Sequence, residues 1–318
     1  IQEVKGHNWP AMLFPIDEEA IYEAVLVPMQ FLLEPNKRLY FGYILSALIL
    51  ATWVYHRHIW RSRNSLSQSL FLAGLLRFIF PKAIWLNRSS AIDFGLLCLN
   101  ATLKALLFIP LIISAFSVGF YTVKLLTLVF GPLELSGTET STVSQSFLIL
   151  SYSLSLTLVL DASRYLLHRL MHQIPWLWQF HKWHHSARTM TPLTLYRIHP
   201  VESALQYTRD VLVTGVVTGC FFYCSGQNID LTTIMGVNAA RFAFNLFGAN
   251  LRHSHIWLSF GPLERIFISP AQHQIHHSSA PEHHNLNFGS QLSIWDRMGG
   301  TLYRTDQYER LNFGLKRP

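Results

Sequence analysis

Apolar residues occur in long runs along this chain, and polar residues gather between the runs. The first run that could cross a bilayer extends from Leu39 to about Tyr55, and a basic segment from His56 to Arg63 follows it. Lys and Arg collect on the cytoplasmic side of membrane proteins, so this end of the span is expected to be cytoplasmic. Residues 69–80 are apolar but too few to cross about 30 Å of hydrocarbon, which predicts a helix near the membrane surface.

A second apolar region covers residues 94–130 and is longer than one simple span requires. It fits either one long tilted helix or a span followed by a broken piece, and the pattern does not separate these two interpretations. Residues 131–146 are polar and acidic without Lys or Arg, which is typical of the external side.

Later apolar runs return to the membrane. Residues 147–160 continue without a helix breaker to His172, which predicts one helix that carries histidines out of the bilayer. Residues 205–224 and 231–247 predict two helices joined by a turn at 225–230. The predicted fold is all-α: a polytopic membrane protein with about four transmembrane helices and a cytoplasmic, histidine-rich helical cap.

Composition supports a membrane protein. Half of the 318 residues are hydrophobic and 14% are charged, against about a quarter charged in soluble domains. No linker or repeat divides the chain, so residues 1–318 are expected to form a single integral-membrane domain. The formal charge of +7 is scattered among apolar segments, which favours contact with anionic lipid head groups and argues against nucleic acid as a partner.

Histidines provide the candidate chemistry, because thirteen of the sixteen lie between His168 and His284. They form three groups: His168 and His172; His181, His184 and His185; and His273, His276 and His277. Helical residues three or four apart share a face, so each group points its rings together. Clustered imidazoles need partners for their ring nitrogens, and a metal ion accepts those lone pairs.

The identity of the metal follows from the ligand types. No cysteine lies near the histidines, which argues against a structural zinc site. The Glu-x-x-His pairs of soluble di-iron bundles are absent from the three groups. Eight or more imidazoles suit two first-row ions, and iron supplies redox chemistry for a membrane site.

The motifs HRLMH, HKWHH and HQIHH, followed by NFG and WDRMGGTLY, make the chain resemble the fatty acid hydroxylase superfamily, and within it the sterol desaturase-like branch. The resemblance covers roughly residues 145–305. It implies a four-helix membrane scaffold with a cytoplasmic cap and a di-iron centre of two iron ions. It also implies electrons from NAD(P)H, delivered through a reductase and a cytochrome or ferredoxin.

By this resemblance, the eight histidines of the three groups match the family's ligands and His253 matches a further one. The predicted metal ligands are therefore His168, His172, His181, His184, His185, His253, His273, His276 and His277. The family often has Asn where this chain has His255, and Asp where it has Asn285, so hydrogen bonding around the ligands is expected to differ here.

Four more residues are candidates for an outer contact or an extra ligand. Asp161 lies two helical turns before His168, where its carboxylate could accept a ring proton; a counter-ion for a nearby arginine is the alternative. His199 could ligate or orient a ligand, and His255 could replace His253. His283 lies on a predicted loop beside the last group.

The predicted function is a membrane-bound di-iron oxygenase that uses dioxygen and external electrons to hydroxylate or desaturate a lipid such as a sterol or fatty acyl lipid. The expected partners are the lipid substrate, the membrane and an electron-transfer protein, with the histidines on the cytoplasmic side. The alternative is a metal-dependent membrane hydrolase, which would need carboxylate ligands that do not accompany the histidines. A metal transporter would place histidines along the spans rather than at their ends.

Overall fold

The structure is a computed structural model that describes residues 29–60, 68–103, 114–132, 142–225, 242–304 and 307–315. Within these ranges all regular elements are helices, and the only strand-like pairings are two isolated bridges, Phe267 with Leu292 and Ser278 with Phe313. The α-helices are α2 (Phe41–Tyr55), α3 (Gln68–Ile79), α4 (Lys82–Trp85), α5 (Arg88–Leu103), α6 (Ala115–Phe130), α7 (Thr142–Gln173), α8 (Pro175–His185), α9 (Pro200–Ser225), α11 (Pro270–His276) and α12 (Ile294–Gly299). The expected all-α class is confirmed for these residues.

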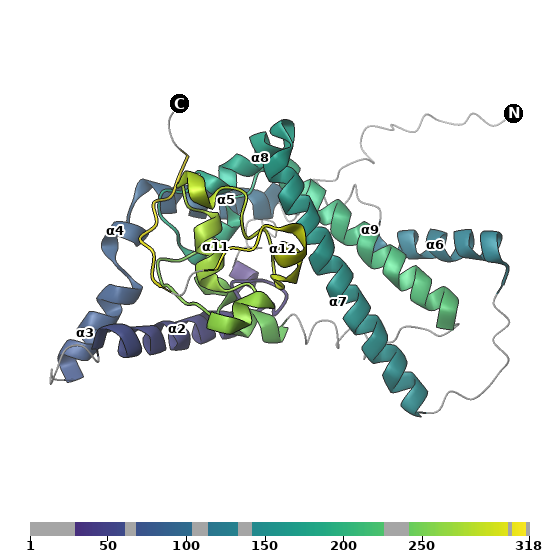
Figure 1. The fold of residues 1–318 in the computed structure, drawn as a ribbon, viewed down its shortest axis with the longest axis horizontal. Coiled ribbons are helices and arrows are strands. Elements are labelled where there is room, and N and C mark those ends of the chain that lie inside the picture. The colour runs from purple at the N-terminus through teal and green to yellow at the C-terminus, as the bar shows by residue number, and fades with distance from the viewer. Residues whose placement is uncertain are drawn as a thin grey trace, which may run out of the picture.

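Helix α7 is the longest element and links the two ends of the molecule (Figure 1). It runs unbroken for 32 residues because no Pro or Gly interrupts it. The predicted continuation from the apolar run to His172 is therefore confirmed. Pro175 then starts α8 at its first turn, where a missing N–H costs nothing.

Helices α6 and α9 pack closely against each other, and α9 also packs along α7. Small residues allow the close approach: a Cβ on Gly219 would lie 2.7 Å from the Gly119 carbonyl oxygen, and one on Gly215 would lie 2.8 Å from that of Ala115. Such small-residue contacts are typical of helices that associate in membranes.

A cap of short helices and loops surrounds α11 at the other end (Figure 1). Its hydrophobic support comes from α2 and α3, whose Ala51, Val54 and Ile79 are buried against Leu251 and Ile256. This cluster fixes the segment between those last two residues, which contains His253.

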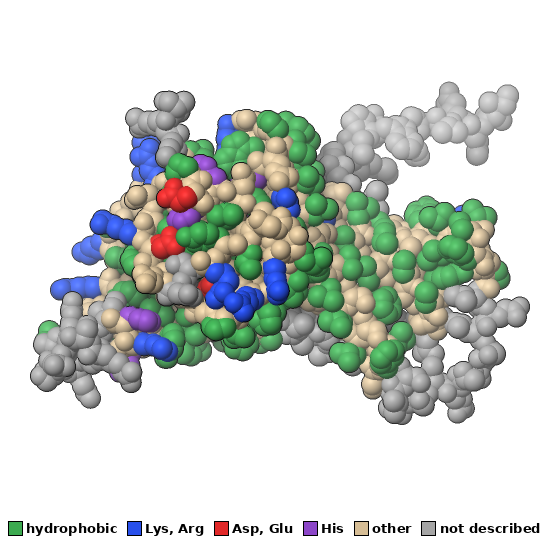
Figure 2. All heavy atoms as spheres, viewed as in Figure 1, with side chains coloured by type: hydrophobic (Ala, Val, Ile, Leu, Met, Phe, Trp, Pro, Cys, Tyr) green, Lys and Arg blue, Asp and Glu red, His purple; other side chains and the backbone are tan. Residues whose placement is uncertain are grey.

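Hydrophobic side chains cover the surface of α6, α7 and α9, whereas charged side chains gather over the cap (Figure 2). One described helix, Ser146–Gln173, is long and apolar enough to cross a membrane, and only 17% of its most apolar window is buried inside the protein. The helical segments Leu70–Trp85 and Arg88–Leu103 meet at a bend of 82°, and together they would form a second span if the bent pair crosses the membrane as one unit. Helix Ala115–Phe130 is apolar but shorter.

The structure refines several predicted elements. The apolar region 94–130 holds two helices, α5 and α6, and the residues between them, 104–113, lie outside the described ranges. The predicted helix 205–224 is the later part of α9. Residues 226–230 of the predicted turn, and most of the predicted second helix 231–247, lie outside the described residues. The expected count of four spans stays a prediction.

Candidate metal centre

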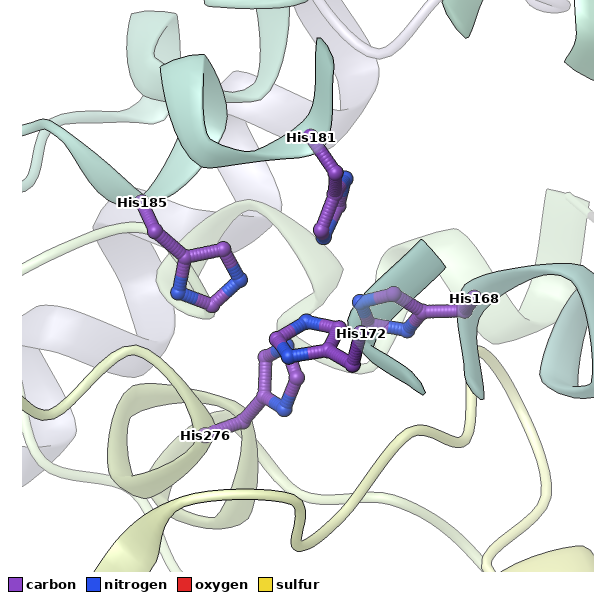
Figure 3. Close-up of side chains that lie close together, drawn as sticks. All are labelled: His168, His172, His181, His185 and His276. Atoms are coloured by element: carbon purple, nitrogen blue, oxygen red, sulfur yellow. The ribbon is translucent and has the colours of Figure 1, made fainter. Parts of the chain in front are cut away.

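Five histidines from three helices form the first group, in which one ring nitrogen from each lies within 4.8 Å of all the others. Helix α7 supplies His168 and His172, α8 supplies His181 and His185, and α11 supplies His276. Their rings point toward one another from different sides (Figure 3). Of the three groups expected from the sequence, only His168 and His172 stay together. The other two are divided, because His184, His273 and His277 belong to a second group.

Four more histidines form the second group under the same distance limit: His184, His253, His273 and His277. Their Nε2 atoms form a chain of contacts, 3.1 Å from His184 to His253, 3.0 Å from His253 to His273 and 3.2 Å from His273 to His277. The two groups adjoin, because the rings of His185 and His277 stack with centroids 4.4 Å apart.

Hydrogen bonds within the second group cannot satisfy all of these contacts. Each ring nitrogen of a neutral imidazole has one proton or one lone pair, so it makes one good hydrogen bond, whereas Nε2 of His253 and Nε2 of His273 each contact two other nitrogens. A metal ion held by these histidines would resolve the conflict, because it can accept lone pairs from several ring nitrogens at once.

The first group fits a metal for a different reason. The Nε2 atoms of His172, His181, His185 and His276 are buried and have no hydrogen-bond partner. Buried polar atoms without partners are costly. Four of them directed into one space are explained by an ion that accepts their lone pairs, so the residues present fit metal binding.

Hydrogen bonds from the outer nitrogens fix three of these rings. The Nδ1 atom of His168 lies 2.9 Å from the Phe288 carbonyl, and that of His276 lies 2.7 Å from the Leu286 carbonyl. The Nδ1 atom of His181 lies 3.0 Å from Oε1 of Glu202. Donation of the Nδ1 proton leaves the lone pair on Nε2, directed toward the centre.

Burial keeps the cap histidines neutral. It lowers the pKa of His181 and of His184 to about 3, with the charge of His181 adding to the effect on His184. Burial followed by repulsion from neighbouring rings lowers the pKa of His185, His273 and His277 well below the usual value. Neutral imidazoles offer lone pairs near pH 7 without first losing a proton.

Local capping places the last histidine group. Ser269 caps α11 by accepting a hydrogen bond from the Gln272 N–H, while the Gln272 side chain accepts from the Ser269 N–H. Pro270 occupies the first turn. This capping box fixes where the helix begins, and therefore the direction in which its histidines point.

The other four predicted candidates lie outside both groups. His199 accepts from the Val201 N–H, His255 Nε2 donates to the Phe78 carbonyl 2.6 Å away, and His283 Nε2 lies 3.1 Å from Glu309. None of the three reaches the centre, because each ring already points to another partner.

Asp161 also differs from its predicted role. Its carboxylate accepts from the N–H groups of Gln291 and Leu292 and from Nε1 of Trp295, at 2.9 to 3.0 Å. The carboxylate therefore holds the segment after Phe288 against α7 rather than accepting a ring proton. It acts on the centre only through the position of that segment.

Glu202 occupies the role that was predicted for Asp161. It is 1% exposed and lies in the first turn of α9, after Pro200. The sequence did contain a sign of this role, because Glu202 is a carboxylate at the start of an apolar helix. A carboxylate in such a place is costly to bury unless it has a specific partner.

Two cavities reach the histidines. One, of about 370 Å³, is lined by His172, His185, His276 and His277 together with Trp178 and part of the C-terminal segment. The other, of about 440 Å³, is lined by His168, His181, His184, His253 and His273 together with several cationic side chains. The centre is therefore accessible from two directions.

Fold and site together define a helical protein with two adjoining histidine groups that could hold metal ions, beside a long apolar helix. Residues 153–301 match the family model described as fatty acid hydroxylase. Ornithine lipid hydroxylase OlsE of Rhizobium tropici is 28% identical over 151 residues, which are 48% of this chain and 41% of that protein.

Two further relatives are named for different activities. Alkylglycerol monooxygenase of Homo sapiens is 29% identical over 158 residues, 50% of this chain and 32% of that protein. Delta(7)-sterol 5(6)-desaturase of Eremothecium gossypii is 27% identical over 157 residues, 49% of this chain and 38% of that protein. The chain spans less than half the length of each of these relatives. No solved structure matches the chain significantly.

Proposed function

We propose that this protein is a membrane-bound di-iron oxygenase that uses dioxygen and external electrons to hydroxylate or desaturate a carbon–hydrogen bond of a lipid. The observation that carries the proposal is the pair of adjoining groups of histidines, nine residues in all, in the region of the fatty acid hydroxylase match. The names of the relatives, a lipid hydroxylase, a monooxygenase and a sterol desaturase, support oxidation of a lipid.

The ligand set favours oxidation over hydrolysis. Hydrolytic metal sites commonly include a carboxylate ligand, whereas both groups found among the described residues consist of histidine alone. We assign the first ion to His168, His172, His181, His185 and His276, and the second to His184, His253, His273 and His277. Two iron ions held there would supply dioxygen activation and the removal of hydrogen from an alkyl carbon.

The side chains of the protein position the ligands and limit the access of water. Glu202 and the carbonyls of Phe288 and Leu286 hold three rings by their Nδ1 atoms, so Nε2 faces inward. Phe288 is 1% exposed and lies against the rings of His168 and His172. This apolar wall excludes water from one side of the centre.

The topology that we propose has about four transmembrane helices, with the histidine cap on the cytoplasmic side. The outward-facing apolar surface of α7 and the basic segment after α2 support this arrangement. Electrons would come from NAD(P)H through a reductase and a cytochrome or ferredoxin, as the resemblance implies. A lipid could then enter from the bilayer beside α7.

Metal analysis of the purified protein tests the assignment. We expect close to two equivalents of iron in the wild type, and about one equivalent or less after His276→Ala or His184→Ala, which remove a ligand from the first and second group respectively. His58→Ala, at an exposed position outside both groups, is the matched control and should keep the full content. Full iron content in both ligand variants would contradict the site.

Lipid analysis tests the activity. Membranes of cells that express the wild type should contain a lipid heavier by one oxygen or lighter by two hydrogens than its precursor, and the His184→Ala form should lack this product. An unchanged lipid profile with oxygen and reductant supplied, in cells whose protein holds its iron, would refute oxidation of a lipid while leaving the metal site intact.

A further inference from the structure

Two of the motifs that carried the family resemblance contain no proposed metal ligand. They are NFG at residues 287–289 and WDRMGGTLY at residues 295–303. The two motifs bind each other, because the N–H groups of Phe288 and Gly289 each donate to a carboxylate oxygen of Asp296 at 2.7 Å. The hydroxyl of Thr301 donates to the same carboxylate, also at 2.7 Å. Asp296, which lies on α12, thus holds the loop that precedes this helix.

The carboxylate of Asp296 has an unusual environment for a charged group. Asp296 is 0% exposed, and no lysine, arginine or histidine in the described ranges lies within ion-pair distance of it. A buried carboxylate is costly unless hydrogen bonds replace those it made to water, and the three donors supply them here. Gly289 makes the contact possible, because a Cβ on Gly289 would lie 2.7 Å from Oδ2 of Asp296. The backbone of the loop is therefore closely fitted to this carboxylate.

One peptide group connects Asp296 to the proposed ligand His168. The Gly289 N–H and the Phe288 carbonyl belong to the same planar trans peptide, so they point in opposite directions. The N–H donates to Asp296, and the carbonyl oxygen lies 2.9 Å from Nδ1 of His168. The position of the carboxylate therefore sets the direction in which this carbonyl meets the His168 ring.

We propose that Asp296 is a positioning residue for the first group of histidines. Through this peptide it holds the Phe288 carbonyl where the carbonyl accepts the Nδ1 proton of His168, and the ring then presents the lone pair of Nε2 to the ion. The inference rests on the metal assignment within the proposed function and does not depend on the reaction. Asp161 binds N–H groups further along the loop, so it does not hold this peptide.

A double-mutant cycle with cobalt as the probe tests this role in the whole chain, held in nanodiscs. Every protein in the cycle carries His184→Ala, so that the first group is the site measured. The cycle compares the cobalt dissociation constants of this parent, of Asp296→Asn, of His168→Ala and of the double variant. Asparagine keeps the shape of the side chain but offers one acceptor oxygen in place of two, so it cannot hold both N–H groups.

Asp296→Asn in the parent should weaken cobalt binding about tenfold, the lower limit for loss of an outer partner, because its effect passes through a peptide. The same substitution should have almost no effect once His168 is alanine, since residues that act through one another are not additive. An equal loss with and without His168 would show a general structural role and overturn the proposal.

The matched control is Tyr152→Phe, which removes a buried hydrogen bond between α7 and Thr218 of α9 and touches no histidine. It should leave the cobalt affinity unchanged, and a loss equal to that of Asp296→Asn would show that affinity follows stability and overturn the proposal. If Asp296→Asn does not fold, Thr301→Val takes its place in the cycle, because it removes one donor to the carboxylate. Its loss should be smaller and should also require His168.

The visible absorption of bound cobalt provides a second measurement. Asp296→Asn should shift the bands, because the His168 ring turns relative to the ion, whereas an unchanged spectrum and affinity would overturn the proposal. Failure of this inference is distinct from failure of the proposed function. Tight cobalt binding with additive effects would refute the inference alone. The expected coupling to His168, without lipid oxidation by the iron-loaded wild type, would support the inference and refute the proposed reaction.

Discussion

Glu202→Gln is the substitution that best tests how the protein orients its proposed ligands. The Glu202 side chain is buried, with Oε1 3.0 Å from Nδ1 of His181 and 2.8 Å from Nε2 of Gln206. Glutamine has nearly the same shape and keeps one oxygen acceptor but loses the negative charge. The substitution therefore weakens the contact to His181 without opening a cavity.

The expected effect on metal affinity can be estimated. Loss of an outer partner of a metal-bound histidine typically lowers affinity about 10- to 100-fold, which corresponds to about 1.4–2.7 kcal/mol. Glu202→Gln should lie near the lower limit, because an amide oxygen can still accept the Nδ1 proton. Glu202→Ala should lie near the upper limit, because it removes the acceptor and leaves the His181 Nδ1 without a partner.

Competition with a chromophoric chelator measures both dissociation constants, and thermal unfolding of the metal-free proteins shows whether the fold is intact. Gln206→Leu is the matched control, since it removes a partner of Glu202 without touching a histidine, and it should change metal affinity less than Glu202→Ala. Wild-type affinity in a correctly folded Glu202→Ala protein would refute the role assigned to this carboxylate.

Three further predictions concern stability and metal content. Asp161→Asn should destabilise the protein by about 1–3 kcal/mol, because one amide oxygen cannot accept from all three donors; an unchanged melting temperature would contradict this. Ser269→Ala should cost about 0.5–2 kcal/mol by removing the cap of α11 and should also weaken metal binding, whereas an effect on neither would show that packing alone fixes the helix. Chelation should lower the melting temperature and added iron should restore it, since a ligand at 100 times its dissociation constant stabilises by about 2.7 kcal/mol; a melting temperature insensitive to both would argue against a bound ion.

The histidine pairs of the centre could be predicted from the sequence because they depend on the spacing of residues within one helix. His168 and His172, and likewise His273 and His277, lie four residues apart, and helical geometry alone places each pair on one face. The unbroken run from residue 147 to His172 predicted α7 for a similar reason. Which histidines share a group was not predictable: the adjacent His184 and His185 belong to different groups, because neighbours on a helix diverge by about 100°.

The contacts around the ligands depended on tertiary packing that spacing does not reveal. Asp161 lies on the same helix face as His168, which made it the natural candidate for the outer partner. The loop at Gln291 and Leu292 folds against α7 and presents unpaired N–H groups to that carboxylate instead. Glu202 reaches His181 from α9, 21 residues away in sequence. A buried carboxylate binds whichever donors the fold brings to it, so its partner is decided by the packing of α9 and the loop against the histidine helices rather than by its own position along a helix.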